Sequence, residues 1–401
     1  MRAAVLNIGD EVLLGHTINT NLSLIAKTIW DYGILIDEQV TVRDEKKDII
    51  EAFCRLFDKY DMIFTSGGLG PTVDDMTTEC IADALGRDLV LNEDVLKDLE
   101  YYFISSGRKM TENNKKQAVF PSDSEVINND FGTASGYFLR EQGKWIIVLP
   151  GPPIEVKNIL TKFLNRYKTK EKISIKIINT QGIGESTLEE RLRKLDLNSN
   201  YSVNTYFGSG GVDIKIVSED RNGNELQKLV DKLTKEFKEN IYDYDSDSIS
   251  KSLLKKLIEK DKTVAFAESC TGGNVSIRFI ENPDASRALI CSLVTYSDES
   301  KMKELDVKAE TLKEHTAVSE EVAREMLEGL KNKYHADYYA ITTGYASPTE
   351  DKRTNGLVYI GIYDRENDKT ILLEDNFFGT RMQIIDRVTN YLFFNIIKLM
   401  G

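Results

Sequence analysis

The stretch Phe266-Ala267-Glu268-Ser269-Cys270-Thr271-Gly272-Gly273 follows an apolar run that predicts a buried strand, and it precedes a segment with apolar residues at helical spacing over 274–280. The stretch therefore predicts a strand-to-helix turn of an α/β unit, where ligands bind outside the carboxyl ends of the strands. A helix N-terminus offers unpaired N–H groups to an anion or oxyanion. The same residues also suit a plain helix cap, with Ser269 or Thr271 as the N-cap residue. Both interpretations stay open at this point.

The length and composition restrict the class of protein. A chain of 401 residues suggests about three domains, and no apolar run approaches the roughly 20 residues of a bilayer span. The first residues, 1–8, indicate a strand and not a signal peptide. The four cysteines and three histidines lack the spacing of a disulfide framework or a metal site. We expect a cytoplasmic protein with free thiols and no membrane partner. The net charge of -13 disfavours capture of nucleic acid, which depends on Lys and Arg.

The pattern of segments along the chain predicts three domains. Residues 1–168 alternate strand-like and helix-like segments, which indicates an α/β domain with a mostly parallel sheet covered on both faces. Residues 169–245 predict a small α+β module, with a linker over 240–248. Residues 246–401 are again α/β. The expected fold class is α/β, with two three-layer α/β domains joined by the α+β module.

Three loops follow apolar strands of the first domain, at residues 9–20, 66–75 and 150–155. On a doubly wound sheet such loops gather at one edge. The glycines of the second loop let backbone N–H groups approach a phosphate. Acidic side chains nearby would repel that phosphate unless a cation lies between, and they are oxygen donors of the kind that hold Mg²⁺; they are Glu11, Asp74 and Asp75. Turn glycines and helix-start acids are the alternative explanation.

Taken together, the motifs resemble the CinA family (competence/damage-inducible protein A) over essentially the whole chain. The N-terminal motifs are Gly9-Asp10-Glu11-Val12-Leu13-Leu14-Gly15, Ser66-Gly67-Gly68-Leu69-Gly70-Pro71-Thr72-Val73-Asp74-Asp75, Asn114-Lys115-Lys116-Gln117-Ala118, Gly132-Thr133-Ala134-Ser135-Gly136 and Pro150-Gly151-Pro152-Pro153. The C-terminal motifs are Ala267-Glu268-Ser269-Cys270-Thr271-Gly272-Gly273, Val294-Thr295-Tyr296-Ser297, Lys301, residues 317–323, Thr343-Gly344 and Gly379-Thr380-Arg381. The resemblance implies a MoaB/MogA-like molybdopterin-binding domain with metal-dependent ADP-ribose pyrophosphatase activity, a KH-like middle domain, and a nicotinamide mononucleotide deamidase domain. It also implies a homodimer.

The resemblance assigns roles at the C-terminal site. Deamidation is acyl transfer to water and needs a nucleophile, a base and an oxyanion site. The family pattern puts the nucleophile at Ser269 and the base at Lys301, with Tyr296 relaying or positioning the proton and no cofactor. A lysine base must be neutral, so its pKa must be lowered. Cys270 is the second candidate nucleophile, and N–H groups after Ser269 would hold the oxyanion. The implied substrate-binding residues are Thr271, Gly272, Gly273, Thr343, Gly344 and Arg381, the last as a bidentate phosphate donor.

At the N-terminal site the resemblance implies that a water held by a divalent metal ion (Mg, Mn or Co) attacks phosphorus. Its ligands would be Glu11, Asp74 and Asp75. The residues expected to bind ADP-ribose are Ser66, Gly67, Gly68, Gly70, Thr72, Gly151 and Pro152.

The sequence departs from the family pattern in the C-terminal part. The loop Tyr345–Gly356 is shorter and poor in glycine, and Pro283-Asp284 and Cys291-Ser292 replace expected glycine-containing pairs. A bulkier loop would narrow or close the pocket. The alternative function is therefore a nucleotide- or pterin-binding protein with a degenerate C-terminal site. A third hypothesis, nucleic-acid binding through the Gly-x-x-Gly of Gly208-Ser209-Gly210-Gly211, is disfavoured because this segment links two strands and lacks Lys or Arg.

Overall fold

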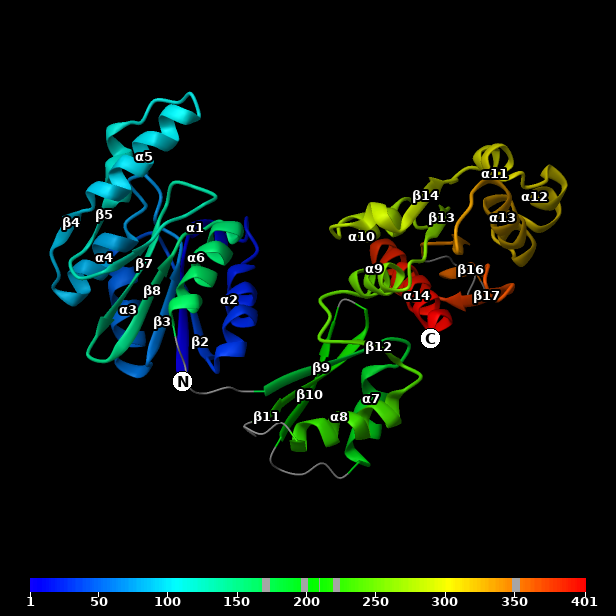
Figure 1. Cartoon of the computed structure of the whole chain (residues 1–401), viewed down its shortest axis with the longest axis horizontal. Helices are drawn as coiled ribbons and strands as arrows, with labels where there is room; N and C mark the ends of the chain where they lie inside the picture. The colour runs from blue at the N-terminus through cyan, green and yellow to red at the C-terminus, as the bar shows by residue number, and fades with distance from the viewer. Residues whose placement is uncertain (168–173, 196–200, 209, 219–223, 348–353) are drawn as a thin grey trace. The chain divides into compact units, whose positions relative to one another are not determined.

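The computed structural model describes residues 1–167, 174–195, 201–208, 210–218, 224–347 and 354–401. The chain forms two compact units, Met1–Ile175 and Lys176–Gly401, drawn in Figure 1. Each unit is considered by itself.

A six-stranded sheet in the order β2-β1-β3-β8-β7-β6 forms the centre of the first unit. Its first four strands in that order are parallel, and β7 and β6 are antiparallel to their neighbours. The strands of the unit are β1 (Arg2–Ile8), β2 (Leu35–Val42), β3 (Met62–Ser66), β4 (Leu89–Leu91), β5 (Val119–Pro121), β6 (Glu125–Ile127), β7 (Gly136–Glu141) and β8 (Lys144–Leu149). The helices are α1 (Asp10–Leu13), α2 (Asn21–Ile29), η1 (Trp30–Tyr32), α3 (Lys46–Lys59), α4 (Thr77–Leu85), α5 (Glu93–Ser105), η2 (Glu112–Ala118) and α6 (Pro153–Arg166).

Strand β1 shows why this sheet is covered on both faces. Its side chains are almost all apolar, and successive side chains of a strand point to opposite faces. Ala4 and Leu6 belong to a core shared with α3 and α4. Ala3 and Val5 belong to a second core shared with α2 and α6. A continuous apolar strand with helices on both sides is what the sequence predicts for a parallel sheet.

The middle module contains the four-stranded sheet β10-β11-β9-β12. Its elements are β9 (Ser174–Thr180), α7 (Glu185–Arg193), β10 (Tyr201–Phe207), β11 (Val212–Ser218), α8 (Asn224–Phe237) and β12 (Ile241–Tyr244). The prediction of a linker over 240–248 is wrong in its first half, because Ile241–Tyr244 is a strand paired with β9. Ile241 packs on the module's own apolar core, which keeps this segment in the sheet.

The C-terminal domain has the sheet β14-β13-β15-β16-β17, in which β14, β13 and β15 are parallel. Val264 and Phe266 of β13 face a core with α9, α10 and α14, whereas Ala265 and Ala267 face the core built on α13. The strands are β13 (Val264–Glu268), β14 (Leu289–Val294), β15 (Tyr338–Gly344), β16 (Leu357–Asp364) and β17 (Lys369–Asn376). The helices are α9 (Ile249–Glu259), α10 (Asn274–Ile280), η3 (Ala285–Arg287), α11 (Asp298–Leu305), α12 (Ala309–His315), α13 (Glu320–Lys333) and α14 (Arg381–Met400).

The predicted fold class is therefore confirmed: two α/β domains with an α+β module between them in the chain. Within the described ranges, no helix has the length and apolar character needed to cross a membrane. The strand order also brings the predicted loops together. Strands β1, β3 and β8 are neighbours, with Asn7 opposite Ser66 and Ser66 opposite Leu149. In the C-terminal sheet Glu268 lies between Val294 and Thr342.

Candidate active sites

A cavity of about 450 Å³ opens at the carboxyl edge of the first sheet. All ten residues that the sequence nominated in this domain line it, from the three loops that follow β1, β3 and β8. They are Glu11, Ser66, Gly67, Gly68, Gly70, Thr72, Asp74, Asp75, Gly151 and Pro152. The prediction that these loops meet at one edge is thus confirmed by the strand order.

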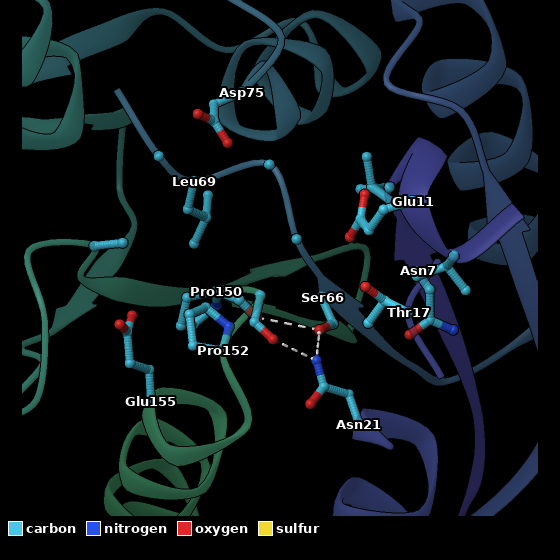
Figure 2. A pocket seen from close by; sticks show the side chains of 18 of the residues that line it. Asn7, Glu11, Thr17, Asn21, Ser66, Leu69, Asp75, Pro150, Pro152 and Glu155 are labelled. Carbon is cyan, nitrogen blue, oxygen red and sulfur yellow. Dashed lines mark hydrogen bonds between the residues drawn. The ribbon is translucent and has the colours of Figure 1, made fainter. Parts of the chain in front are cut away.

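Asn21 joins two of the loops, as Figure 2 shows. Its amide nitrogen donates to Ser66 Oγ at 2.8 Å and to the carbonyl of Gly151 at 2.7 Å. Ser66 Oγ in turn donates to the carbonyl of Pro150 at 3.1 Å. Gly67 has φ +109°, and a Cβ there would lie 2.1 Å from the carbonyl oxygen of Ile8, so only glycine fits. Asn21 ends the segment Asn19-Thr20-Asn21, which resembles part of the family's first motif, but its own role was not predicted from the sequence.

The charge of this cavity is one-sided. Its carboxylates are Glu11, Asp44, Asp74, Asp75 and Glu155, and no Lys, Arg or His lines it in the part of the chain that the structure describes. Burial raises the pKa of Asp44, and the neighbouring acids Glu11, Asp10 and Asp75 raise it further, against a hydrogen bond from the Asp10 N–H that lowers it. An anionic ligand needs a cation to enter such a cavity.

The three predicted metal ligands share the cavity but do not form a ready-made cluster. Asp75 Oδ2 accepts hydrogen bonds from the N–H of Thr72 at 2.9 Å and from Thr72 Oγ1 at 2.6 Å. In the part of the chain that the structure describes, no group of three or more His, Cys, Asp or Glu is gathered to hold a metal. The donors are all hard oxygens, which fits Mg²⁺ or a similar ion in chemistry. The metal site stays a prediction.

In the C-terminal domain, the carboxylate of Glu268 organises the turn that carries Ser269. Glu268 is fully buried and accepts hydrogen bonds from the N–H groups of Gly273 (2.9 Å), Val275 (3.0 Å) and Ser276 (2.8 Å). The hydroxyls of Thr271 and Ser276 also donate to it, at 2.8 and 2.6 Å. The start of α10 is therefore capped from inside the protein. The expectation that this helix N-terminus offers its N–H groups to a ligand is wrong, because Glu268 already uses them.

The turn itself leaves two backbone donors available. Gly272 and Gly273 have φ +59° and +100°, a left-handed backbone that favours glycine. The N–H of Ser269 donates to the carbonyl of Thr342 at 2.9 Å and that of Gly272 to the carbonyl of Ser269 at 3.1 Å. The N–H groups of Cys270 and Thr271 have no acceptor in another described residue, so they are the remaining oxyanion donors of the predicted group.

Lys301 is buried at 1% exposure, although it lies on the short helix α11. Its Nζ donates to the carbonyls of Thr295 at 3.1 Å and Tyr296 at 3.0 Å. The N–H of Thr295 donates to the carbonyl of Glu268, immediately before Ser269. Burial lowers the pKa of Lys301, while the charge of Asp298 opposes that shift. A neutral amine has two N–H bonds, and two carbonyls that accept them would leave its lone pair free as a base.

Ser269 is 7% exposed, and its hydroxyl makes no hydrogen bond with the described residues. Cys270 is also buried, and burial raises the pKa of its thiol to about 12. Because the thiolate is the reactive form, Cys270 does not suit the role of second candidate nucleophile.

The other nominated residues divide into exposed and internal ones. Arg381 donates to the hydroxyl of Tyr296 at 3.1 Å and to Ser347 at 2.8 Å, all at the surface. Thr343 Oγ1 instead donates to the carbonyl of Ala317 at 2.6 Å, and Gly344 ends strand β15, opposite Val358. Tyr296 as a proton relay stays a prediction. Of the loop Tyr345–Gly356, residues 348–353 lie outside the described residues.

The Gly-x-x-Gly segment is packed inward where it is described. A Cβ at Gly208 would lie 1.9 Å from Asp213, one at Gly210 2.8 Å from Tyr242, and one at Gly211 2.5 Å from the carbonyl oxygen of Thr180. Ser209 lies outside the described residues. These glycines serve close packing.

The fold and the two sites define a protein with a molybdopterin-binding-like α/β domain, a KH-like module and a second α/β domain. Three family models match the chain: "Probable molybdopterin binding domain" over residues 4–169, "Damage-inducible protein CinA KH domain" over 175–244 and "CinA C-terminal domain" over 246–400. The chain belongs to the CinA family.

Curated relatives match over nearly the whole length. A "Putative competence-damage inducible protein" of Clostridioides difficile is 41% identical over 410 residues, covering 98% of this chain and 97% of the relative. The protein of the same description from Alkaliphilus oremlandii is 38% identical, with the same coverage. A solved structure of CinA from Thermoplasma acidophilum is 34% identical, covers 41% of this chain and 96% of its own, and has a TM-score of 0.39.

We expect Glu268→Gln to lower the free energy of unfolding by about 2–3 kcal/mol. The NH2 group of the glutamine would replace an acceptor by a donor, and buried N–H groups would lose their acceptor. Urea unfolding followed by circular dichroism measures this. Glu281→Gln is the matched control, since Glu281 lies at the other end of α10 and is about half exposed. Equal stability of the two variants would contradict the internal cap.

Proposed function

We propose that this CinA-family chain is a hydrolase with two sites for pyridine nucleotides. The C-terminal domain deamidates nicotinamide mononucleotide with Ser269 as nucleophile and Lys301 as base. The N-terminal domain cleaves the pyrophosphate of ADP-ribose with a divalent metal ion. The observation that carries the first activity is the buried, carbonyl-held amine of Lys301 at the strand edge that also bears Ser269.

The chemistry of deamidation follows from these groups. Ser269 Oγ attacks the amide carbon while its proton passes to Lys301. Lys301 then gives that proton to the departing nitrogen, which leaves as ammonia, and water hydrolyses the resulting ester. The free N–H of Thr271 suits the oxyanion. Arg381, at the surface beside Tyr296, suits the ribose phosphate.

The N-terminal proposal rests on charge. Among the described residues the cavity has five carboxylates and no basic side chain, so it repels a bare pyrophosphate. A divalent cation bound by Glu11, Asp74 and Asp75 would offset part of that negative charge and give the phosphate oxygens a positive partner. Such an ion supplies electrostatic stabilisation of the phosphate oxygens. Backbone N–H groups of the glycine loop 66–70 and the hydroxyl of Thr72 suit the phosphate itself.

Replacing Ser269 by Ala should abolish ammonia release from nicotinamide mononucleotide, because no other hydroxyl occupies its place. Cys270→Ser is the neighbouring control and should keep most of the activity, since the buried thiol takes no part. An enzyme-coupled ammonia assay measures both. A wild-type protein that releases no ammonia would instead favour the degenerate C-terminal site.

The pH profile should report Lys301. The base must be neutral, so kcat falls as the pH drops through its pKa. The charge of Asp298 raises that pKa, and Asp298→Asn should therefore move the acid limb of the profile to lower pH. Glu299→Gln is the control, because Glu299 is exposed and does not act on Lys301. An unmoved limb in Asp298→Asn would argue against Lys301 as the base.

Metal removal should stop the N-terminal reaction. We expect EDTA to abolish AMP release from ADP-ribose and Mn²⁺ to restore it. Asp74→Asn should raise the Mn²⁺ concentration for half-maximal rate at least about tenfold. Asp130→Asn is the control, because Asp130 pairs with Lys162 at 2.7 Å and lies outside the cavity. Binding of ADP-ribose without cleavage in any divalent metal would favour the pterin- or nucleotide-binding alternative.

A further inference from the structure

The five carboxylates of the N-terminal cavity fall into two sets. In the first set, the charges of Glu11 and Asp75 act on Asp44 and raise its pKa. Asp74 is next to Asp75 in the chain and belongs to the same set. Glu155 lies on the opposite side of the cavity from Glu11 and Asp75, as Figure 2 shows. It belongs to the first turn of α6, directly after the loop Pro150–Pro153.

Glu155 shares partial burial with Asp44, but other carboxylates raise the pKa of Asp44 whereas none contributes to that of Glu155. Its carboxylate is half buried, and Oε2 accepts a hydrogen bond from Asn129 Nδ2 at 2.8 Å. Gly132 lies close to the other carboxylate oxygen, because a Cβ at this glycine would lie 2.3 Å from Oε1. Burial raises the pKa of Glu155, and the hydrogen bond from Asn129 is the one opposing influence.

No charged group counteracts that burial. The loop 128–135 that packs against Glu155 has one charged residue, Asp130, which pairs with Lys162. The charged side chains that line the rest of the cavity are the other carboxylates, and among the described residues no Lys, Arg or His lines it. The two sets of acids therefore lie in different environments. One set suits binding of a cation, and the other suits transfer of a proton, so metal binding and acid–base catalysis can be carried out by different residues.

We propose that Glu155 is the general base for pyrophosphate cleavage in this cavity, positioned by Asn129, while the carboxylates opposite hold the cation. This inference rests on the proposed N-terminal function. The oxygen of a water forms a bond to one phosphorus, and the bond from that phosphorus to the bridging oxygen breaks. One water proton passes to the Glu155 carboxylate, and the other stays on the phosphate that gained the oxygen. The second phosphate leaves with the bridging oxygen.

A charge at a helix N-terminus is the competing explanation for Glu155, because acids are common in first turns. That explanation predicts equal effects at any first-turn acid. Glu93 opens α5 in the same domain, is exposed, and lies outside the cavity. Glu93→Gln is therefore the matched control for Glu155→Gln.

The test uses the full chain with Mn²⁺ and ADP-ribose. Glu155→Gln should lower kcat about 100-fold or more, with KM and the affinity for Mn²⁺ alone, measured by calorimetry, unchanged. Asn129→Ala removes the hydrogen bond that keeps the pKa of Glu155 down, so it should move the acid limb of the kcat profile to higher pH and keep the plateau rate. Glu93→Gln should match wild type in every readout.

Three results would overturn the inference. The first is a Glu155→Gln variant with wild-type kcat. The second is weakened Mn²⁺ binding in that variant, which would make Glu155 a metal ligand. The third is an unmoved acid limb in Asn129→Ala. A wild-type chain that cleaves no pyrophosphate with any divalent metal removes the proposed function itself, and the general base with it; an active wild type with any of the three results removes the base alone.

Discussion

The carboxylate of Glu268 holds the C-terminal site together. It sits at the end of a strand buried on both faces and takes five hydrogen bonds from the turn and the first residues of α10. A buried carboxylate that loses its hydrogen-bond donors lowers the stability of the fold. A change in the conformation of the turn would break these hydrogen bonds and is therefore unfavourable. Ser269, the residue after Glu268, is thereby held at the sheet edge beside the carbonyls that fix Lys301. This one carboxylate fixes both the start of α10 and the position of Ser269.

The two domains treat charge in opposite ways. In the C-terminal domain the carboxylate of Glu268 accepts hydrogen bonds from N–H groups and hydroxyls of the same domain. The buried amine of Lys301 donates to neutral carbonyls. The N-terminal cavity is lined by five carboxylates, and among the described residues its lining has no partner of opposite sign. The first arrangement suits chemistry on a neutral amide, and the second makes affinity for a phosphate conditional on a cation. The same strand-edge topology therefore carries two sites of different electrostatic character.

The sequence predicted more of the fold than of the site. The pattern of apolar strands followed by polar loops predicted β1, β3, β8 and β13. It also predicted that ten cavity residues lie at one edge of the sheet, because a parallel topology can be inferred from local sequence patterns. The role of Glu268 could not be read in this way, since a strand-end acid looks the same whether it faces a ligand or caps its own helix. The environment of Glu155 could not be predicted for a related reason. It depends on contacts with Asn129 and Gly132, which are distant in sequence. The strand Ile241–Tyr244 was missed because four residues carry too short a pattern.

The burial of Lys301 has a consequence for how this protein would look to chemical labelling. Its amine is 1% exposed, and the two acceptors to which it donates are backbone carbonyls. Amine-reactive probes and acetylating metabolites select lysines by access as much as by protonation state. Surveys based on such reagents would modify the exposed lysines of this chain and pass over Lys301, the proposed base.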